Sequence, residues 1–269
     1  RDEIFKSIMA IKKIRLTNFK SFKDVDIELG NFNILIGANA SGKSNFIQIF
    51  KFLRSIPIWG LDDAISGQGG IEYFRNINIG SSEGFSLEAV SDRELTMLGP
   101  KTKEKGQIGI KTYEIIYNLA LGFEDKSFEI TNDELKFKCE FVRLEKKKGE
   151  IKESNMLGKG EMSFYRAGEE VDVNLKLPNG LSIKKDDILT PFLRELNPKM
   201  SLLCHPVSTI RQPYLFGEIS MYDFDPKKAK QANPIPSVTS ILTENGSNLS
   251  LILKNILEDK EKKRKLSIL

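Results

Sequence analysis

The sequence predicts an α/β fold in which a mixed sheet with one long helix carries a large antiparallel β insert. A mostly apolar run at 32–36 leads into a helical pattern at 43–55, and the segment 84–185 alternates between apolar and polar residues. A short apolar run is typical of a strand buried on both faces of a parallel or mixed sheet. Strict alternation is typical of half-exposed strands, so the later segment predicts antiparallel pairing.

The first elements are three strands within residues 11–36. Two of them alternate, because Ile14 and Leu16 are separated by a basic residue and Val25 and Ile27 by an acidic one. The third is the apolar run at 32–36, which ends at Gly37. We expect it to be buried on both faces.

Residues 43–55 predict a helix, because apolar residues recur there at helical spacing. Pro57 is expected to end it. The glycine-rich stretch 66–70 predicts a loop.

The segment 84–185 predicts antiparallel strands, with a polar loop over 146–161 and a hairpin turn at Asn179-Gly180. Beyond it we expect a short helix at 188–196 and one more strand at 215–223. An amphipathic helix is expected to begin at Ser247. The predicted division is a lobe at 1–83, the β insert at 84–200, a return strand and linker at 201–238, and the start of a helical arm at 239–269.

Composition limits the classes of protein. The chain has 269 residues, 40% of them hydrophobic, and a net charge of +4, which indicates a globular protein rather than a disordered chain. Cys139, Cys204 and His205 are too few for a four-ligand zinc site or a disulfide framework, so we expect a reducing, cytoplasmic setting. No apolar run approaches about 18 residues, so no membrane span is predicted.

One motif carries chemistry. The eight residues from Gly37 to Ser44 match G-x-x-x-x-G-K-[ST] in full, between the predicted strand and helix. Backbone N–H groups of such a loop form an anion site, and the helix dipole adds to it. Lys43 is expected to reach the β and γ phosphates of a nucleotide, and Ser44 to place a hydroxyl on Mg²⁺. The predicted loop contacts are Gly37, Ala38, Asn39, Ala40, Ser41, Gly42, Lys43 and Ser44.

Residues 11–53 resemble the N-terminal lobe of ABC-type ATPases of the SMC/RecF class. They are especially similar to the prokaryotic AAA-type, ABC-like ATPases that include the OLD-like proteins. The resemblance rests on the turn Asn18–Phe22 before the second strand, on Asn39 within the loop and on Asn45 after it. Residues 242–249 resemble a helix start of the same group.

The resemblance implies the fold of a P-loop NTPase, ATP with Mg²⁺ as cofactors, and a homodimer closed around the nucleotides. By the same analogy Asn18, Lys20, Ser21 and Asn45 are candidate nucleotide contacts. A glutamine of the family contacts Mg²⁺; Gln231 is the candidate here, with Gln212 and Gln68 as rivals. DNA is a possible partner by inheritance, and the six basic residues among the first twenty are equally explained by a solvated strand face.

Two parts of the hydrolytic machinery of that class are not found in the sequence. No apolar strand ends in Asp-Glu, and no Leu-Ser-Gly-Gly signature occurs. Asp62-Asp63 and Asp223 come nearest to the first, and no catalytic residue is assigned. We therefore expect an ATP-binding module that needs a further C-terminal half or an effector domain to hydrolyse ATP. The alternative is an ATP-gated scaffold or DNA-associated module with no turnover of its own; a P-loop kinase or a transporter subunit fits less well.

Overall fold

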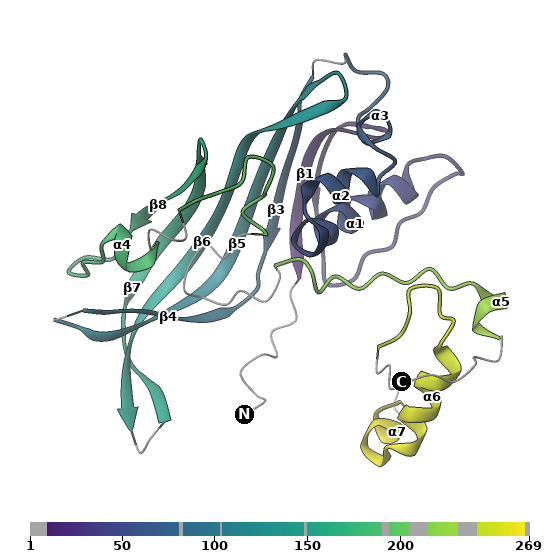
Figure 1. The fold of residues 1–269 in the computed structure, drawn as a ribbon. Helices are drawn as coiled ribbons and strands as arrows, with labels where there is room; N and C mark the ends of the chain where they lie inside the picture. Colours follow the sequence, from purple (N-terminus) through teal and green to yellow (C-terminus); the bar gives the residue numbers. More distant parts are fainter. Residues whose placement is uncertain are drawn as a thin grey trace. The chain divides into compact units, whose positions relative to one another are not determined.

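The computed structural model describes residues 10–80, 83–102, 104–147, 150–189, 194–204, 215–230 and 241–266. The chain divides after Glu218 into two compact units, each described below by itself (Figure 1). The boundaries predicted at residues 83, 200 and 238 stay predictions.

One eight-stranded sheet dominates the first unit, and all its pairs are antiparallel. Its order is β2-β1-β3-β5-β6-β7-β8, and β4 pairs with β5. The strands are β1 (Ile11–Phe19), β2 (Phe22–Glu28), β3 (Phe85–Ser91), β4 (Leu95–Thr102), β5 (Gly106–Glu124), β6 (Ser127–Lys147), β7 (Glu150–Ala167) and β8 (Glu170–Lys176). The antiparallel insert is therefore confirmed, whereas a mixed sheet is not found in the described residues.

The apolar run at 32–36 is the cause of that difference. It forms no strand, and Phe32 and Ile36 are 82% and 91% exposed. The strand β2 is one edge of the sheet and pairs only with β1 in the described residues. In the described residues no strand lies beside the run to pair with it, so the run forms no regular secondary structure. The prediction of a buried strand is wrong for this structure.

The β insert extends further than its sequence pattern indicated. The strands β6 and β7 continue through most of 146–161, pairing from Glu134 with Tyr165 to Lys147 with Glu150. The predicted polar loop is thus wrong: polar side chains suit a hairpin whose faces both meet solvent. At Asn179-Gly180 the chain does turn, and the short helix α4 (Lys185–Ile188) follows instead of a paired strand. Of the helix expected at 188–196, residues 190–193 lie outside the described residues, and residues 194–196 are not helical.

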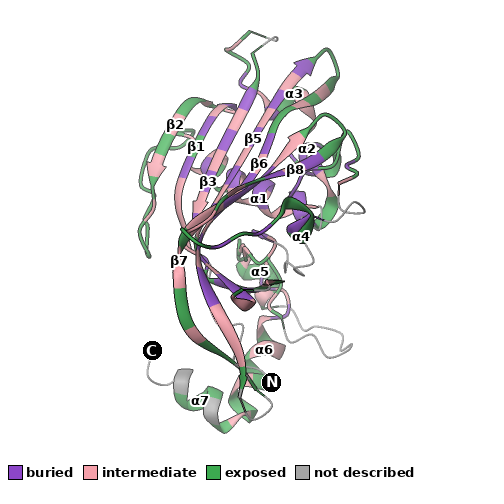
Figure 2. Cartoon of the chain, turned by 90° about the vertical axis from the view of Figure 1, so that its left-hand side faces the viewer, coloured by how far each residue is buried: buried purple, intermediate pink, exposed green. Residues whose placement is uncertain are grey.

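One face of the sheet is covered by α1 (Lys43–Trp59), α2 (Leu61–Ser66) and α3 (Ile71–Phe74) (Figure 1). On β3 every second residue is buried, from Phe85 to Ser91, and Figure 2 shows the alternation along the strands. Phe74 of α3 lies at the centre of this core, with ring centroids 5.1 Å from Phe19, 4.9 Å from Phe52 and 4.8 Å from Phe85. Such ring pairs stabilise a core beyond their buried area.

Pro57 does not end α1, which continues to Trp59. A proline inside a helix removes one backbone hydrogen bond and crowds the carbonyl four residues before it. Pro57 lies within three residues of the end of α1 and is buried with the apolar face of the helix. The helix ends at Gly60, which has φ +88° and donates its N–H to the carbonyl of Ile56.

The second unit, from Ile219, contains α5 (Pro226–Ala229), α6 (Leu249–Glu258) and α7 (Lys260–Leu266). The amphipathic helix expected from Ser247 is thus confirmed, with a break at Asp259. The strand expected at 215–223 is wrong: residues 215–218 form turns, and residues 219–223 are in no strand. Phe216 has φ +65°, far from the extended values of a regular strand. No helix in the described part of the chain combines the length and apolar character needed to span a membrane.

A buried polar network ties the segment 201–202 to the sheet. The Asp133 carboxylate on β6 is fully buried and accepts a hydrogen bond of 2.7 Å from the N–H of Leu202. The hydroxyls of Tyr117 and Ser201 lie 2.8 Å apart beside it. Burial raises the pKa of Asp133 to about 7, and the Leu202 N–H limits the rise.

We predict that Asp133 makes the protein less stable as the pH rises from about 4 to about 7. The folded state holds the carboxyl proton more tightly than the unfolded state does. The stability that the protonated Asp133 contributes is therefore fully present below the unfolded pKa and is lost as the pH rises through the folded pKa. Asp133→Asn resembles the protonated acid. Urea unfolding followed by circular dichroism should give a wild-type stability that declines relative to Asp133→Asn by a few kcal/mol across this range.

Asp125→Asn is the matched control, because Asp125 is exposed in the β5–β6 turn. It should show no such pH-dependent difference from the wild type. A difference between wild type and Asp133→Asn that stays constant from pH 4 to 8 would contradict the prediction.

Candidate functional site

The glycine-rich loop 37–42 leads into α1 and is shaped by its backbone. Ala40 and Gly42 have φ +62° and +92°, and the N–H of Ser41 donates to the carbonyl of Ala38 at 3.3 Å. A Cβ on Gly37 would lie 2.7 Å from Ser41 Oγ, and one on Gly42 would need a strained backbone. These two glycines therefore allow a tight turn that a side chain would block.

The side chain of Lys43 folds back over the loop. Its Nζ donates to the carbonyl oxygens of Gly37 at 2.8 Å and Ala38 at 2.6 Å. The N-cap of α1 is Gly42, which offers no side-chain hydrogen bond, and no acidic residue stands in the first turn. The first N–H groups of a helix have no partner within it. An ammonium group and the positive end of a helix thus meet at one loop, as an anionic ligand requires.

The β1–β2 turn packs against this loop. Asn45 Nδ2 donates to Ser21 Oγ at 2.8 Å, and a Cβ on Gly42 would lie 3.2 Å from the same oxygen and 3.4 Å from the Phe22 ring. The structure therefore brings Ser21 and Asn45 beside the predicted loop.

Asn18 and Lys20 of the same turn bond to the protein itself. The buried Asn18 side chain donates to the carbonyl of Glu83 at 2.6 Å and accepts from the N–H of Asn76 at 2.9 Å. Lys20 Nζ donates to the carbonyls of Gln68 at 3.0 Å and Tyr73 at 3.4 Å, and burial lowers the pKa of Lys20. In this structure both side chains hold the turn in place; a contact to a ligand remains a prediction.

The predicted metal ligands are only partly described. Ser44 lies exposed in the first turn of α1, while Gln231 and its rival Gln212 lie outside the described residues. The described residues contain no group of three or more His, Cys, Asp or Glu side chains that could hold a metal ion. The donor set here, one hydroxyl beside a phosphate site, fits Mg²⁺ held largely by phosphate oxygens and water.

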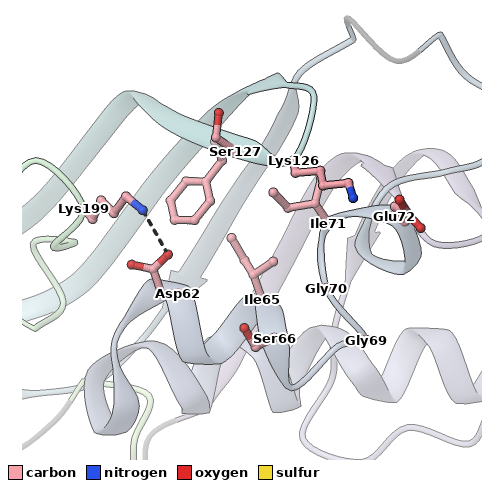
Figure 3. A pocket seen from close by; sticks show the side chains of 11 residues that line it. Asp62, Ile65, Ser66, Gly69, Gly70, Ile71, Glu72, Lys126, Ser127 and Lys199 are labelled. Atoms are coloured by element: carbon pink, nitrogen blue, oxygen red, sulfur yellow. Dashed lines mark ion pairs between the residues drawn. The ribbon is translucent and has the colours of Figure 1, made fainter.

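Asp62 lies in the first turn of α2, not at the end of a strand. It forms an ion pair of 3.6 Å with Lys199, drawn as a dashed line in Figure 3. The pair borders a pocket of about 370 Å³ between α2, the Gly69-Gly70 turn and the β5–β6 turn. Asp223 stands in the second unit, where no strand leads to it. Neither position has the strand-end context expected of a metal-supporting aspartate.

The cysteines are structural in the described residues. Both are free thiols. Burial raises the pKa of Cys139 to about 12 and that of Cys204 to about 11, so neither is ionised near neutral pH. His205 lies outside the described residues.

The sequence did not reveal a second pocket, which lies next to the glycine-rich loop and includes Asn45. It is open, has a volume of about 530 Å³, and is lined by Lys20, Asn45, Gln68, Gly69 and Tyr73. The available signal was an aromatic residue, Tyr73, three positions after the Gly69-Gly70 pair. Periodicity could not identify it, because the pocket assembles from four separate stretches of chain.

The model of the family described as "AAA ATPase domain" matches residues 9–264. A search of the curated proteins found no match.

We predict that Asn18→Ala lowers the free energy of unfolding by about 1–3 kcal/mol, because it removes the partner of the Glu83 carbonyl and leaves the buried N–H of Asn76 unpaired by Asn18. Thermal unfolding followed by circular dichroism measures the change. Asn33→Ala is the matched control: its side chain also makes two main-chain hydrogen bonds, both to Gly30, but is exposed. An equal loss in both variants would contradict the role given to Asn18.

Proposed function

The chain belongs to the AAA ATPase domain family, and on that premise we propose that it binds Mg²⁺-ATP on the loop Gly37–Ser44. The observation that carries the proposal is the position of Lys43 Nζ over the loop, next to the first turn of a 17-residue helix. The match supports nucleotide binding in general. The assignment of the phosphates to this loop rests on the geometry.

Each residue has a defined part in this proposal. Lys43 exchanges its two carbonyl partners for the β and γ phosphates, and the N–H groups of the first turn of α1 receive phosphate oxygens. Ser44 orients its hydroxyl toward Mg²⁺, which when bound neutralises phosphate charge. Gly37 and Gly42 keep the loop close enough for its N–H groups to converge.

We further propose an ABC-like, SMC/RecF-type arrangement in which two copies close around the nucleotides. Support comes from the apolar side chains of Phe32, Ile34 and Ile36, which are exposed directly before the loop. Exposed apolar groups in a row favour burial against another surface. In such an arrangement the groups that activate water come from outside the described site, and DNA is the proposed effector surface.

The alternative is an ATP-gated scaffold that binds without turnover. The sequence favours it in one respect, because no apolar strand ends in Asp-Glu. Phosphate release measured at high protein concentration distinguishes the two: steady-state release supports an ATPase, and binding without release supports a scaffold.

We predict that Lys43→Ala weakens ATP binding at least about tenfold, since a charged hydrogen bond contributes about 1.5–3 kcal/mol. Isothermal titration calorimetry with Mg²⁺ present measures the affinity. Lys51→Ala is the control, because it removes the same charge from the same helix away from the loop. Unchanged affinity in Lys43→Ala would refute the phosphate site.

A further inference from the structure

The pocket beside the loop borders the proposed phosphate site directly. Asn45, one of its lining residues, follows Ser44 in the first turn of α1. Lys20 and Tyr73 form other parts of its wall, so the pocket lies between the β1–β2 turn and α3. A nucleotide whose phosphates bind the loop also has a sugar and a base that need a binding surface. The open pocket of about 530 Å³ lies next to the loop.

Tyr73 is held with its ring in solvent. The next residue, Phe74, is fully buried among aromatic rings, whereas Tyr73 is 69% exposed. Its carbonyl is bound by Lys20 Nζ, and its N–H donates to the carbonyl of Gly70 at 3.2 Å. The backbone of Tyr73 is thus held in place, and its exposed ring offers a flat surface to a ligand.

The glycines before it make that position attainable. A Cβ on Gly69 would lie 3.0 Å from the Cβ of Tyr73, and Gly69 has φ +99°. Gly70 has φ +82°. Any larger residue at 69 would displace Tyr73 or strain the turn.

Gln68 has an unused hydrogen-bonding capacity at the same place. It lines the pocket, its side chain is only 6% exposed, and its Oε1 has no hydrogen-bond partner in the structure. Buried acceptors are nearly always paired. The last torsion of a glutamine side chain is broad, so a small rotation presents Oε1 to a donor in the pocket.

These features together fit a nucleobase. Aromatic side chains bind bases by stacking, and each base has a flat face to offer. Adenine carries a 6-amino donor for Oε1, whereas hypoxanthine has a carbonyl oxygen at that position. Lys20 adds a positive charge to the pocket wall near the phosphates.

We propose that this pocket is the nucleoside subsite of the chain, in which adenine stacks on Tyr73 and donates from its 6-amino group to Gln68. This rests on the proposed function, since it assumes that the triphosphate occupies the loop. It goes beyond that function by assigning selection of the base to residues 68–73.

The test uses the full chain and three ligands with Mg²⁺: ATP, inosine triphosphate and inorganic tripolyphosphate, titrated by calorimetry. Tyr73→Ala should bind ATP about tenfold more weakly, in line with stacking measured by alanine substitution, and bind tripolyphosphate as the wild type does. Tyr73→Phe should retain ATP affinity, because it keeps the ring. Tyr113→Ala, which removes a half-exposed tyrosine from β5, should change neither.

Gln68→Leu tests the polar contact. The wild type should prefer ATP to inosine triphosphate several-fold, and this variant should lose the preference while its tripolyphosphate affinity stays the same. An equal preference in wild type and variant would overturn the role of Gln68.

The outcomes separate the subsite from the phosphate site. If Tyr73→Ala binds ATP as tightly as the wild type, or loses ATP and tripolyphosphate equally, the nucleoside subsite is overturned and the phosphate site stands or falls on Lys43. If the wild type binds neither ATP nor tripolyphosphate, the proposed function fails, and the subsite fails with it.

Discussion

The hydrogen bonds of the β1–β2 turn are the constraint on which the candidate site depends. Asn18 and Lys20 adopt φ +54° and +50°, which costs a non-glycine residue about 1–2 kcal/mol each. That cost is offset because Asn18 bonds to the chain at 76 and 83, while the Lys20 N–H donates to the carbonyl of Phe74 at 2.9 Å. One short turn thereby connects the sheet, α3 and the start of α1.

The core explains why this connection is rigid. Phe19, at the end of β1, and Phe74, in α3, belong to one aromatic cluster that also contains Phe52 of α1. The turn therefore cannot move without disturbing all three elements. Ser21 and Tyr73 are exposed, but each lies within two residues of a buried ring of this cluster, Phe19 and Phe74 respectively.

The site combines two kinds of recognition in neighbouring places. At the loop, Lys43 and the helix N-terminus offer charge and N–H groups, which suit phosphate. At the pocket, Tyr73 offers a ring and Gln68 an acceptor. In the proposed function the loop binds the phosphates and the pocket selects the base.

The sequence by itself determined the loop, α1 and the antiparallel insert, because each depends on contacts between residues close in the chain or on a period of two or 3.6. It also identified the motif whose Lys43 and Gly37 the structure brings together. Only the tertiary structure showed that the apolar run at 32–36 is exposed and not a buried strand, since burial of a strand depends on whether a neighbouring strand exists. It alone decided the Asp133 network and the pocket at Tyr73, which join residues up to 84 positions apart and leave no local pattern. The physical reason is the same in each case: a local period records which face of an element is apolar, but not what packs against it.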